Sequence, residues 1–322
     1  MSACRTVLIL ALALLAQPGP AAAQASPNRQ TRILVPFAPG GVTDSIARLS
    51  AEWLAARLGQ TFTVENRTGA NGAIAVEAVA RAAPDGATLL TASASQMVML
   101  PALTRLPVDT TADFAPISIV ASNPMVLAVS ADLGVATLAE FVELARQRPG
   151  VLNYSSGGSG SSNHLAMALL LARTGITAQH VPYRGGAPAT VALLAGQVGA
   201  YFANPSDVIP HLGNPRLRVL AVAGTERLAA LPGVPTVAEQ GYEGFVAGTW
   251  NGIAAPAGTP EPVVKRLAET LGLACQDAGF RAALERLGTT PVCGTPDAFR
   301  QAMAADGPMW REAVRLSGAR LE

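Results

Sequence analysis

Two loops rich in glycine and serine hold the residues of this chain that could bind a charged ligand. The first loop, residues 37–44, reads FAPGGVTD, and the second, residues 154–164, reads YSSGGSGSSNH. Each follows a strand-like run and precedes a helix-like pattern. The first N–H groups of a helix lack backbone partners and lie at the positive end of its dipole, so each loop predicts an anion site. Two such sites indicate one small ligand with negative charge at both ends.

The second loop resembles two enzyme motifs without matching either. A nucleophile elbow at Ser159 has Gly157 before it, but Ser161 stands where the later glycine is required. A dinucleotide fingerprint fails because Asn163 replaces its third glycine. An anion cradle needs only consecutive N–H groups and hydroxyls, and a plain flexible loop is the alternative. A serine hydrolase using Ser159 or Ser161 with His164 also stays open, although the sequence names no orienting acid.

Single residues in these loops have structural explanations as well. Gly40 and Gly41 allow a ligand to approach the backbone, while Thr43 or Asp44 can cap the helix that follows. Capping explains Asp44 without any catalytic role. His164 lies in the first turn of its predicted helix, where the dipole disfavours an imidazolium, so we expect a neutral residue that packs or hydrogen-bonds.

Alternating strand-like and helix-like segments must position these loops. Strands are predicted at 33–37, 61–65 and 87–92, with helices at 43–58 and 73–83, and a second set of the same kind runs from 125 to 222. This order predicts mainly parallel sheets covered by helices. The length favours two domains, and Asn123-Pro124 marks the first crossing between them. Loops 183–186 and 202–206 follow strands and could face the same cleft.

The first 25 residues have the features of an export signal. Arg5 precedes the apolar run 7–16, which is too short to span a bilayer, and small residues offer cleavage near Ala23 or Ala25. The full chain has 23 basic and 22 acidic residues, so removing Arg5 leaves a neutral protein. A neutral chain with no basic run excludes nucleic acid and anionic membranes as expected partners.

Cysteine and histidine usage limits the chemistry further. Cys275 and Cys293 are the only cysteines beyond the signal, and in an oxidising compartment they could form a disulfide. Two separate buried thiols are the alternative. The chain has three histidines and no clustered ligand spacing, so we expect neither a metal site nor a cofactor.

In addition, the chain resembles a known family over nearly its whole mature length: the periplasmic receptors of tripartite tricarboxylate transporters, or Bug proteins. The order and spacing of several motifs carry this resemblance. They are VPFAPGGVTD at 35–44, VENR at 64–67, APDG at 83–86, DFAP at 113–116, NYSSG at 153–157, GSSNHL at 160–165, HVPYRG at 180–185, VPTV at 234–237 and AAPAGTP at 254–260.

The resemblance implies a two-lobed α/β binding protein of the type II Venus-flytrap kind, each lobe a mainly parallel sheet flanked by helices. We expect lobe 1 to comprise 26–124 plus 225–322 and lobe 2 to comprise 125–224, after a signal peptide at 1–25. The protein would be a periplasmic monomer that captures a small carboxylate for the membrane subunits of a transporter, with no catalysis. Presentation of the loaded receptor to a sensor is a further alternative.

The resemblance and the loops together give the predicted ligand-binding set. It consists of Phe37, Pro39, Gly40, Gly41, Thr43, Asp44, Ser93, Ser155, Gly157, Ser159, Gly160, Ser161, His164, Tyr183 and Asn204. Gly199 and Ala203 depart from the family pattern, since many relatives have aspartate there. An acidic group at 203 is expected to hold the ammonium of an amino acid, so Ala203 favours a mono- or dicarboxylic acid over an amino acid.

Overall fold

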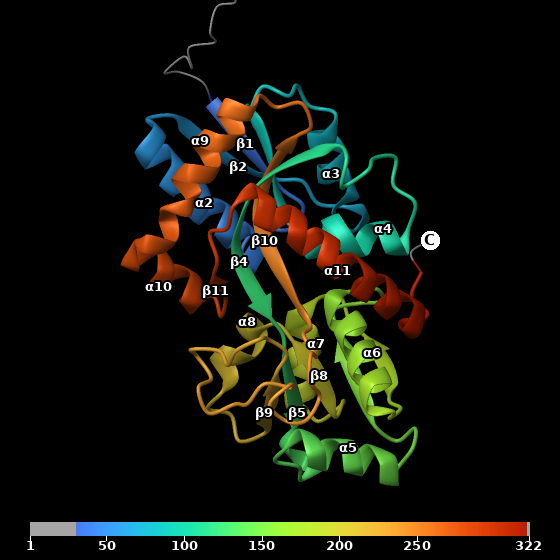
Figure 1. Cartoon of the computed structure of the whole chain (residues 1–322). Coiled ribbons are helices and arrows are strands. Elements are labelled where there is room, and N and C mark those ends of the chain that lie inside the picture. Colours follow the sequence, from blue (N-terminus) through green and yellow to red (C-terminus); the bar gives the residue numbers. More distant parts are fainter. Residues whose placement is uncertain (1–29, 321–322) are drawn as a thin grey trace, which may run out of the picture.

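The computed structural model of this protein describes residues 30–320, and the predicted signal peptide lies outside them. Two separate sheets form the centres of two lobes (Figure 1). The sheet of lobe 1 has β1 (Gln30–Val35), β2 (Thr61–Asn66), β3 (Thr88–Ser93), β4 (Phe114–Pro124), β10 (Gly248–Pro256) and β11 (Thr290–Pro291). The sheet of lobe 2 has β5 (Val126–Ser130), β6 (Asn153–Ser156), β7 (Gln179–Pro182), β8 (Ala200–Ala203) and β9 (Leu217–Val222). The two-lobed α/β prediction is confirmed.

Counted from β2 in lobe 1 and from β7 in lobe 2, five strands of each sheet have the same order, and β11 is an additional edge strand of lobe 1. Lobe 1 runs β11-β4-β10-β3-β1-β2, and lobe 2 runs β7-β6-β8-β5-β9. In lobe 1, β1 to β4 point in one direction and β10 and β11 in the other; in lobe 2, only β5 is reversed. The sheets are therefore mainly parallel, as predicted. In each sheet, a reversed strand that is connected directly to the other lobe lies between two parallel ones.

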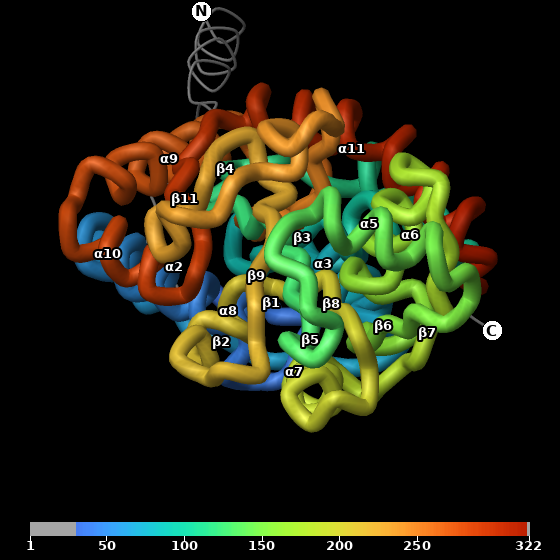
Figure 2. The backbone as a smooth tube through the Cα atoms, turned by 90° about the horizontal axis from the view of Figure 1, so that it is seen from below, coloured from blue at the N-terminus to red at the C-terminus, as the bar shows by residue number. Residues whose placement is uncertain are grey.

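Helices cover both faces of the lobe 1 sheet. They are α2 (Val42–Leu58), α3 (Ala73–Ala80), α4 (Leu100–Leu103), α9 (Glu261–Gly272), α10 (Ala278–Arg286) and α11 (Pro296–Ser317). Figures 1 and 2 place α2 beside α9 and α10, although these helices are far apart in sequence. Trp53 of α2 packs on Phe280 of α10, and its Nε1 donates to the Thr270 carbonyl oxygen at 2.7 Å. The C-terminal segment thus completes the N-terminal half of the lobe.

The helices of lobe 2 are α5 (Leu138–Gln147), α6 (Ser162–Thr174), α7 (Gly186–Leu194) and α8 (Pro205–Val208). Short turns complete the described chain: η1 (Ala70–Gly72), η2 (Ser95–Met99), η3 (Ala131–Leu133), η4 (Ile209–His211) and η5 (Ala274–Gln276). The apolar positions of α5 face the core, and Thr137 caps its first turn by accepting from the Glu140 N–H. No helix among residues 30–320 is long and apolar enough to cross a membrane.

The chain crosses between the lobes at two adjacent places. The first crossing lies between β4 and β5, close to the predicted position. At the second, the Met125 N–H donates to the Ala247 carbonyl oxygen at 3.1 Å, and Gly248 pairs with Pro124. The two connections therefore lie side by side and form the hinge.

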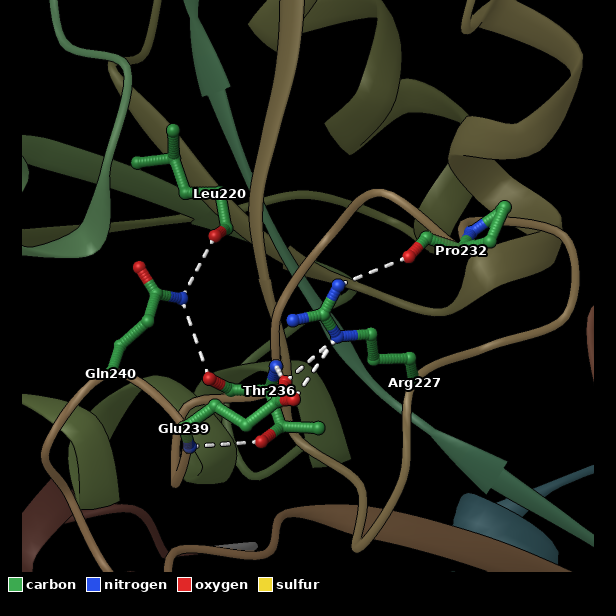
Figure 3. Close-up of polar contacts among 6 residues, drawn as sticks. All are labelled: Leu220, Arg227, Pro232, Thr236, Glu239 and Gln240. Atoms are coloured by element: carbon green, nitrogen blue, oxygen red, sulfur yellow. Dashed lines mark hydrogen bonds and ion pairs between the residues drawn. The ribbon is translucent and has the colours of Figure 1, made fainter.

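Residues 225–247 attach to lobe 2, whereas the sequence predicts them in lobe 1. Figure 3 shows how: Gln240 donates to the Leu220 carbonyl oxygen of β9, and Thr236 and Glu239 cap each other through their backbone N–H groups. Arg227 pairs with Glu239 at 3.0 Å. The Gln240 bond and the backbone hydrogen bonds that Val222 of β9 makes with Pro235 and Val237 tie the segment to β9, so we assign 125–247 to lobe 2. The segment is rich in proline and glycine and shows no strand or helix pattern, so its attachment to lobe 2 was not predicted from the sequence.

Helix α11 connects the two cores. It packs against β4 of lobe 1 and α6 of lobe 2 (Figure 1). Its Trp310 is 0% exposed and belongs to an apolar cluster that contains residues of both lobes. Within lobe 1, a disulfide joins Cys275 of η5 to Cys293, which lies between β11 and α11.

Candidate ligand-binding site

A cleft of about 630 Å³ lies between the lobes beside the hinge. Lobe 1 lines it with Phe37, Gly40, Gly41, Val42, Thr43, Ser45, Asn71, Ser93, Ser95, Gln96, Met99, Leu100, Leu103, Asn123, Thr249, Asn251, Leu287, Gly288 and Thr289. Lobe 2 lines it with Gly157, Gly158, Ser159, Gly160, Ser161, Ser162, Gly186, Asn204, Pro205, Ser206 and Asp207. Both glycine-rich loops therefore face one cavity from opposite sides.

The first loop is held in place by Asp44, which lies behind it. Its carboxylate accepts from the Gly40 N–H at 3.0 Å, from Asn66 Nδ2 at 2.8 Å and from Arg48 Nε at 2.9 Å. Burial raises the pKa of Asp44, but hydrogen bonds from Arg48, Gly40 and Asn66 outweigh it and hold the pKa below its usual value. No side chain caps the start of α2, so its first N–H groups are left for a ligand.

The second loop uses the same arrangement with a different side chain. The Gly160 N–H donates to Nδ1 of His164 at 3.1 Å, four residues ahead, as the Gly40 N–H donates to Asp44. Gly40 and Gly160 both have positive φ, at 88° and 74°, a conformation that favours glycine. Ser161 caps α6 by accepting from the backbone N–H of His164. The two loops follow β1 and β6, which occupy equivalent places in the two sheets.

His164 belongs to a stack of rings behind the second loop. Its ring lies parallel to that of His180 with centroids 3.7 Å apart, and Tyr154 stacks on His180 at 5.1 Å. Ser156 Oγ lies 2.6 Å from Nε2 of His180. Burial, and then the nearby His180, lower the pKa of His164 to about 4. The residue is therefore neutral at pH 7, and its Nδ1 accepts from the loop.

Acid should destabilise the protein through His164. The unfolded chain takes up a proton near pH 6.5, whereas the folded protein does not protonate His164 until about pH 4. Lowering the pH through this window therefore favours unfolding, by up to about 3 kcal/mol. Urea unfolding at pH 7.0, 5.5 and 4.5 measures the loss. His164→Asn keeps an acceptor for Gly160 but does not titrate, so its profile should be flatter; equal profiles would contradict the assignment.

Most of the predicted binding residues line the cleft, and the others lie behind it. In the cleft are Phe37, Gly40, Gly41, Thr43, Ser93, Gly157, Ser159, Gly160, Ser161 and Asn204. Asp44 and His164 are positioning residues behind the loops. Ser155 is fully buried and donates to the Ala189 carbonyl oxygen, Tyr183 packs on the core of lobe 2, and Pro39 is exposed outside the lining. These five residues are therefore removed from the lining set.

The set predicted from the sequence omits several lining residues, because they lie on the hinge strands and on turns that carry no motif. Asn123 of β4 and Asn251 of β10 are 5% and 2% exposed, and the Oδ1 atom of each lacks a partner within residues 30–320. Gln96 lines the cleft from η2 and accepts from the Ser93 hydroxyl. An asparagine within a mainly apolar strand pattern, as in 116–124 and 250–256, was the available signal.

The cleft contains a charged side chain, Asp207, that the sequence analysis did not single out. Among the described lining residues no lysine or arginine is present, and Asp207 is the one ionisable side chain. Ala203, whose type was taken to disfavour amino acids, is 0% exposed and packs in the core of lobe 2. Its side chain lies outside the cleft lining, so it carries no information about the ligand.

Two lobes of equal topology, with facing helix N-termini across a hinged cleft, define a solute-binding protein. The model of the family described as tripartite tricarboxylate transporter family receptor matches residues 46–314, and the chain belongs to this family. It is therefore a solute-binding receptor of the TctC and Bug type, and the receptors of this family are periplasmic.

Individual relatives agree over almost the full length. Protein BugT of Bordetella pertussis is 37% identical over 305 residues, which are 94% of each chain. The Rhodopseudomonas palustris protein Rpa4515, solved with adipate, is 33% identical with a TM-score of 0.80, covering 91% of this chain and 99% of that one. MatC from the same organism, solved with malate, is 32% identical with a TM-score of 0.75, covering 88% and 99%.

Proposed function

We propose that this receptor captures a small organic acid with one or two carboxylates and delivers it to the membrane subunits of a tripartite transporter. The observation that carries the proposal is the pair of glycine loops facing each other across one cleft, each presenting helix N-terminal N–H groups. The carboxylates bound to the relatives solved with adipate and malate support the same ligand class.

Binding would proceed by closure of the lobes about the paired crossings of the hinge. Each loop contacts the ligand from its own lobe, so the closed state gains contacts that the open state lacks. We expect the receptor to act as a monomer and without catalysis. The contacts of the described residues do not favour the hydrolase alternative, because His164 Nδ1 accepts from Gly160, and Ser161 Oγ caps α6.

A panel of organic acids tests this function. Short and long dicarboxylates, aromatic acids and monocarboxylates are screened by thermal shift and confirmed by calorimetry. At a hundredfold excess over Kd, a true ligand should add about 2.7 kcal/mol to the free energy of unfolding. The control is the uncharged amide of each responding acid, in which every carboxylate is replaced, and it should have no effect. No response to any acid would refute the proposal.

A further inference from the structure

Asp207 places a carboxylate in a cleft whose loops are built to bind anions. It lies in α8 of lobe 2, lines the cleft and is partly buried. No lysine or arginine among the described lining residues offsets its charge. An ionised carboxylate only accepts hydrogen bonds. A ligand whose only polar groups are carboxylates therefore has no donor for the Asp207 carboxylate.

The carboxyl group of Asp207 is fixed through one of its two oxygens. Tyr201 Oη donates to Oδ2 at 3.0 Å, and Asn204 Nδ2 donates to the same oxygen at 3.1 Å. Both side-chain bonds go to Oδ2, none goes to Oδ1, and a backbone hydrogen bond from Asn204 also reaches the carboxyl group. Burial raises the pKa of this carboxyl, opposed by the bonds from Tyr201 and Asn204, as is expected for an acceptor that is held away from bulk water.

The backbone beside Asp207 is shaped around this group. A Cβ added at Gly186 would lie 2.6 Å from Oδ2 and 2.8 Å from Oδ1, so the carboxylate needs a glycine there. Gly186 lines the cleft as well. The position of Asp207 therefore depends on two polar partners and on one residue without a side chain.

Acceptors also line the cleft from lobe 1. Asn123 and Asn251 lie on the hinge strands, each nine-tenths or more buried, and each has an unpartnered Oδ1 atom. A buried acceptor without a hydrogen bond raises the free energy of the folded protein. A ligand with a donor group would supply the missing hydrogen bond.

We propose, building on the function above, that Asp207 Oδ1 accepts a hydrogen bond from a hydroxyl or ammonium group on the carbon chain of the ligand. The cleft then selects hydroxy- or amino-substituted organic acids over unsubstituted ones. A hydroxyl and an ammonium group can both donate this hydrogen bond, but only the ammonium group has a positive charge.

Matched acids on one carbon skeleton test the selection. Succinate, malate and aspartate differ only in the substituent at C2, and glutarate, 2-hydroxyglutarate and glutamate repeat the comparison with one more carbon. In calorimetry on the mature protein, the hydroxy or the amino acid of at least one series should bind about tenfold or more tightly than the unsubstituted acid. Equal affinities within each series would overturn the inference while leaving the proposed function standing.

Two variants test whether Asp207 causes the preference for hydroxy or amino acids. Asp207→Asn keeps an oxygen for Tyr201 and Asn204 but removes the charge, so affinity for an amino acid should fall about tenfold or more while the unsubstituted acid binds as well or better. Asp306→Asn is the control, because the Asp306 carboxyl accepts from Trp250 Nε1 outside the cleft lining and its loss should preserve the ratios. Equal losses for all acids in Asp207→Asn would contradict the role.

The outcomes separate the two proposals. If none of the six acids nor any member of the wider panel binds, the proposed function fails and this inference fails with it. If Asp207→Asn does not fold, as judged by circular dichroism, Asp207→Ser replaces it. The wild-type ratios then remain decisive by themselves.

Discussion

Replacing Asp44 with alanine is expected to lower carboxylate affinity about a hundredfold, which corresponds to close to 3 kcal/mol. Asp44 is 3% exposed, and its two oxygens hold Gly40, Arg48 and Asn66 together. Without it, the Gly40 N–H loses its acceptor and the first loop loses the geometry that presents the N–H groups of α2. Calorimetry with an acid that binds the wild type measures the loss.

Two further variants separate loop geometry from general damage. Asp44→Asn keeps one acceptor oxygen but loses the charge that pairs with Arg48, so its loss should be intermediate. Asp297→Ala removes a first-turn carboxylate from α11, where it pairs with Arg300 outside the cleft lining, and should leave affinity unchanged. Wild-type affinity in Asp44→Ala would show that the loop keeps its shape without this carboxylate.

Trp310→Ala should lower the free energy of unfolding by about 3 to 5 kcal/mol. The side chain is 0% exposed and lies in the cluster shared by both lobes, so its removal leaves a cavity where α11 joins β4 to α6. Chemical unfolding monitored by circular dichroism gives the value. We also expect the two lobes to unfold less cooperatively, which calorimetry would show as a broader transition.

Trp310→Phe is the matched control for this cavity. It keeps most of the ring volume and removes Nε1, a buried N–H that has no partner within residues 30–320. The cost should therefore stay below about 1.5 kcal/mol. A loss under 1 kcal/mol in Trp310→Ala would mean that the neighbouring side chains collapse into the space and that α11 does not depend on this residue.

The sequence predicted the parts of the site that local chemistry determines. The loops at 37–44 and 154–164 combine glycines with the start of a helix, and this combination favours an anion site where it follows a strand of a mainly parallel sheet. The alternation of segments likewise predicted two α/β lobes with mainly parallel sheets, which the strand directions confirm.

Long-range pairing produced the parts that the sequence did not predict. Asn123 and Asn251 reach one cleft only because β10 pairs antiparallel with β4, which is more than a hundred residues earlier. Asp44 and His164 were predicted among the ligand-binding residues, yet each bonds back to a glycine of its own loop. Ala203 at the end of β8 turns into the core of lobe 2, whereas Asp207 of α8 lines the cleft, and both directions depend on the packing of lobe 2.

The adjacent crossings at the hinge make lobe 2 a transplantable module. Residues 125–247 leave lobe 1 and return to it at neighbouring points, where Met125 bonds to Ala247 and Gly248 pairs with Pro124. Both ends of the insert thus meet in one place, and the recipient lobe would need no new connection. Chimaeras that exchange this insert between family members would let the two halves of ligand recognition be engineered separately, provided that the packing of α6 against α11 is kept.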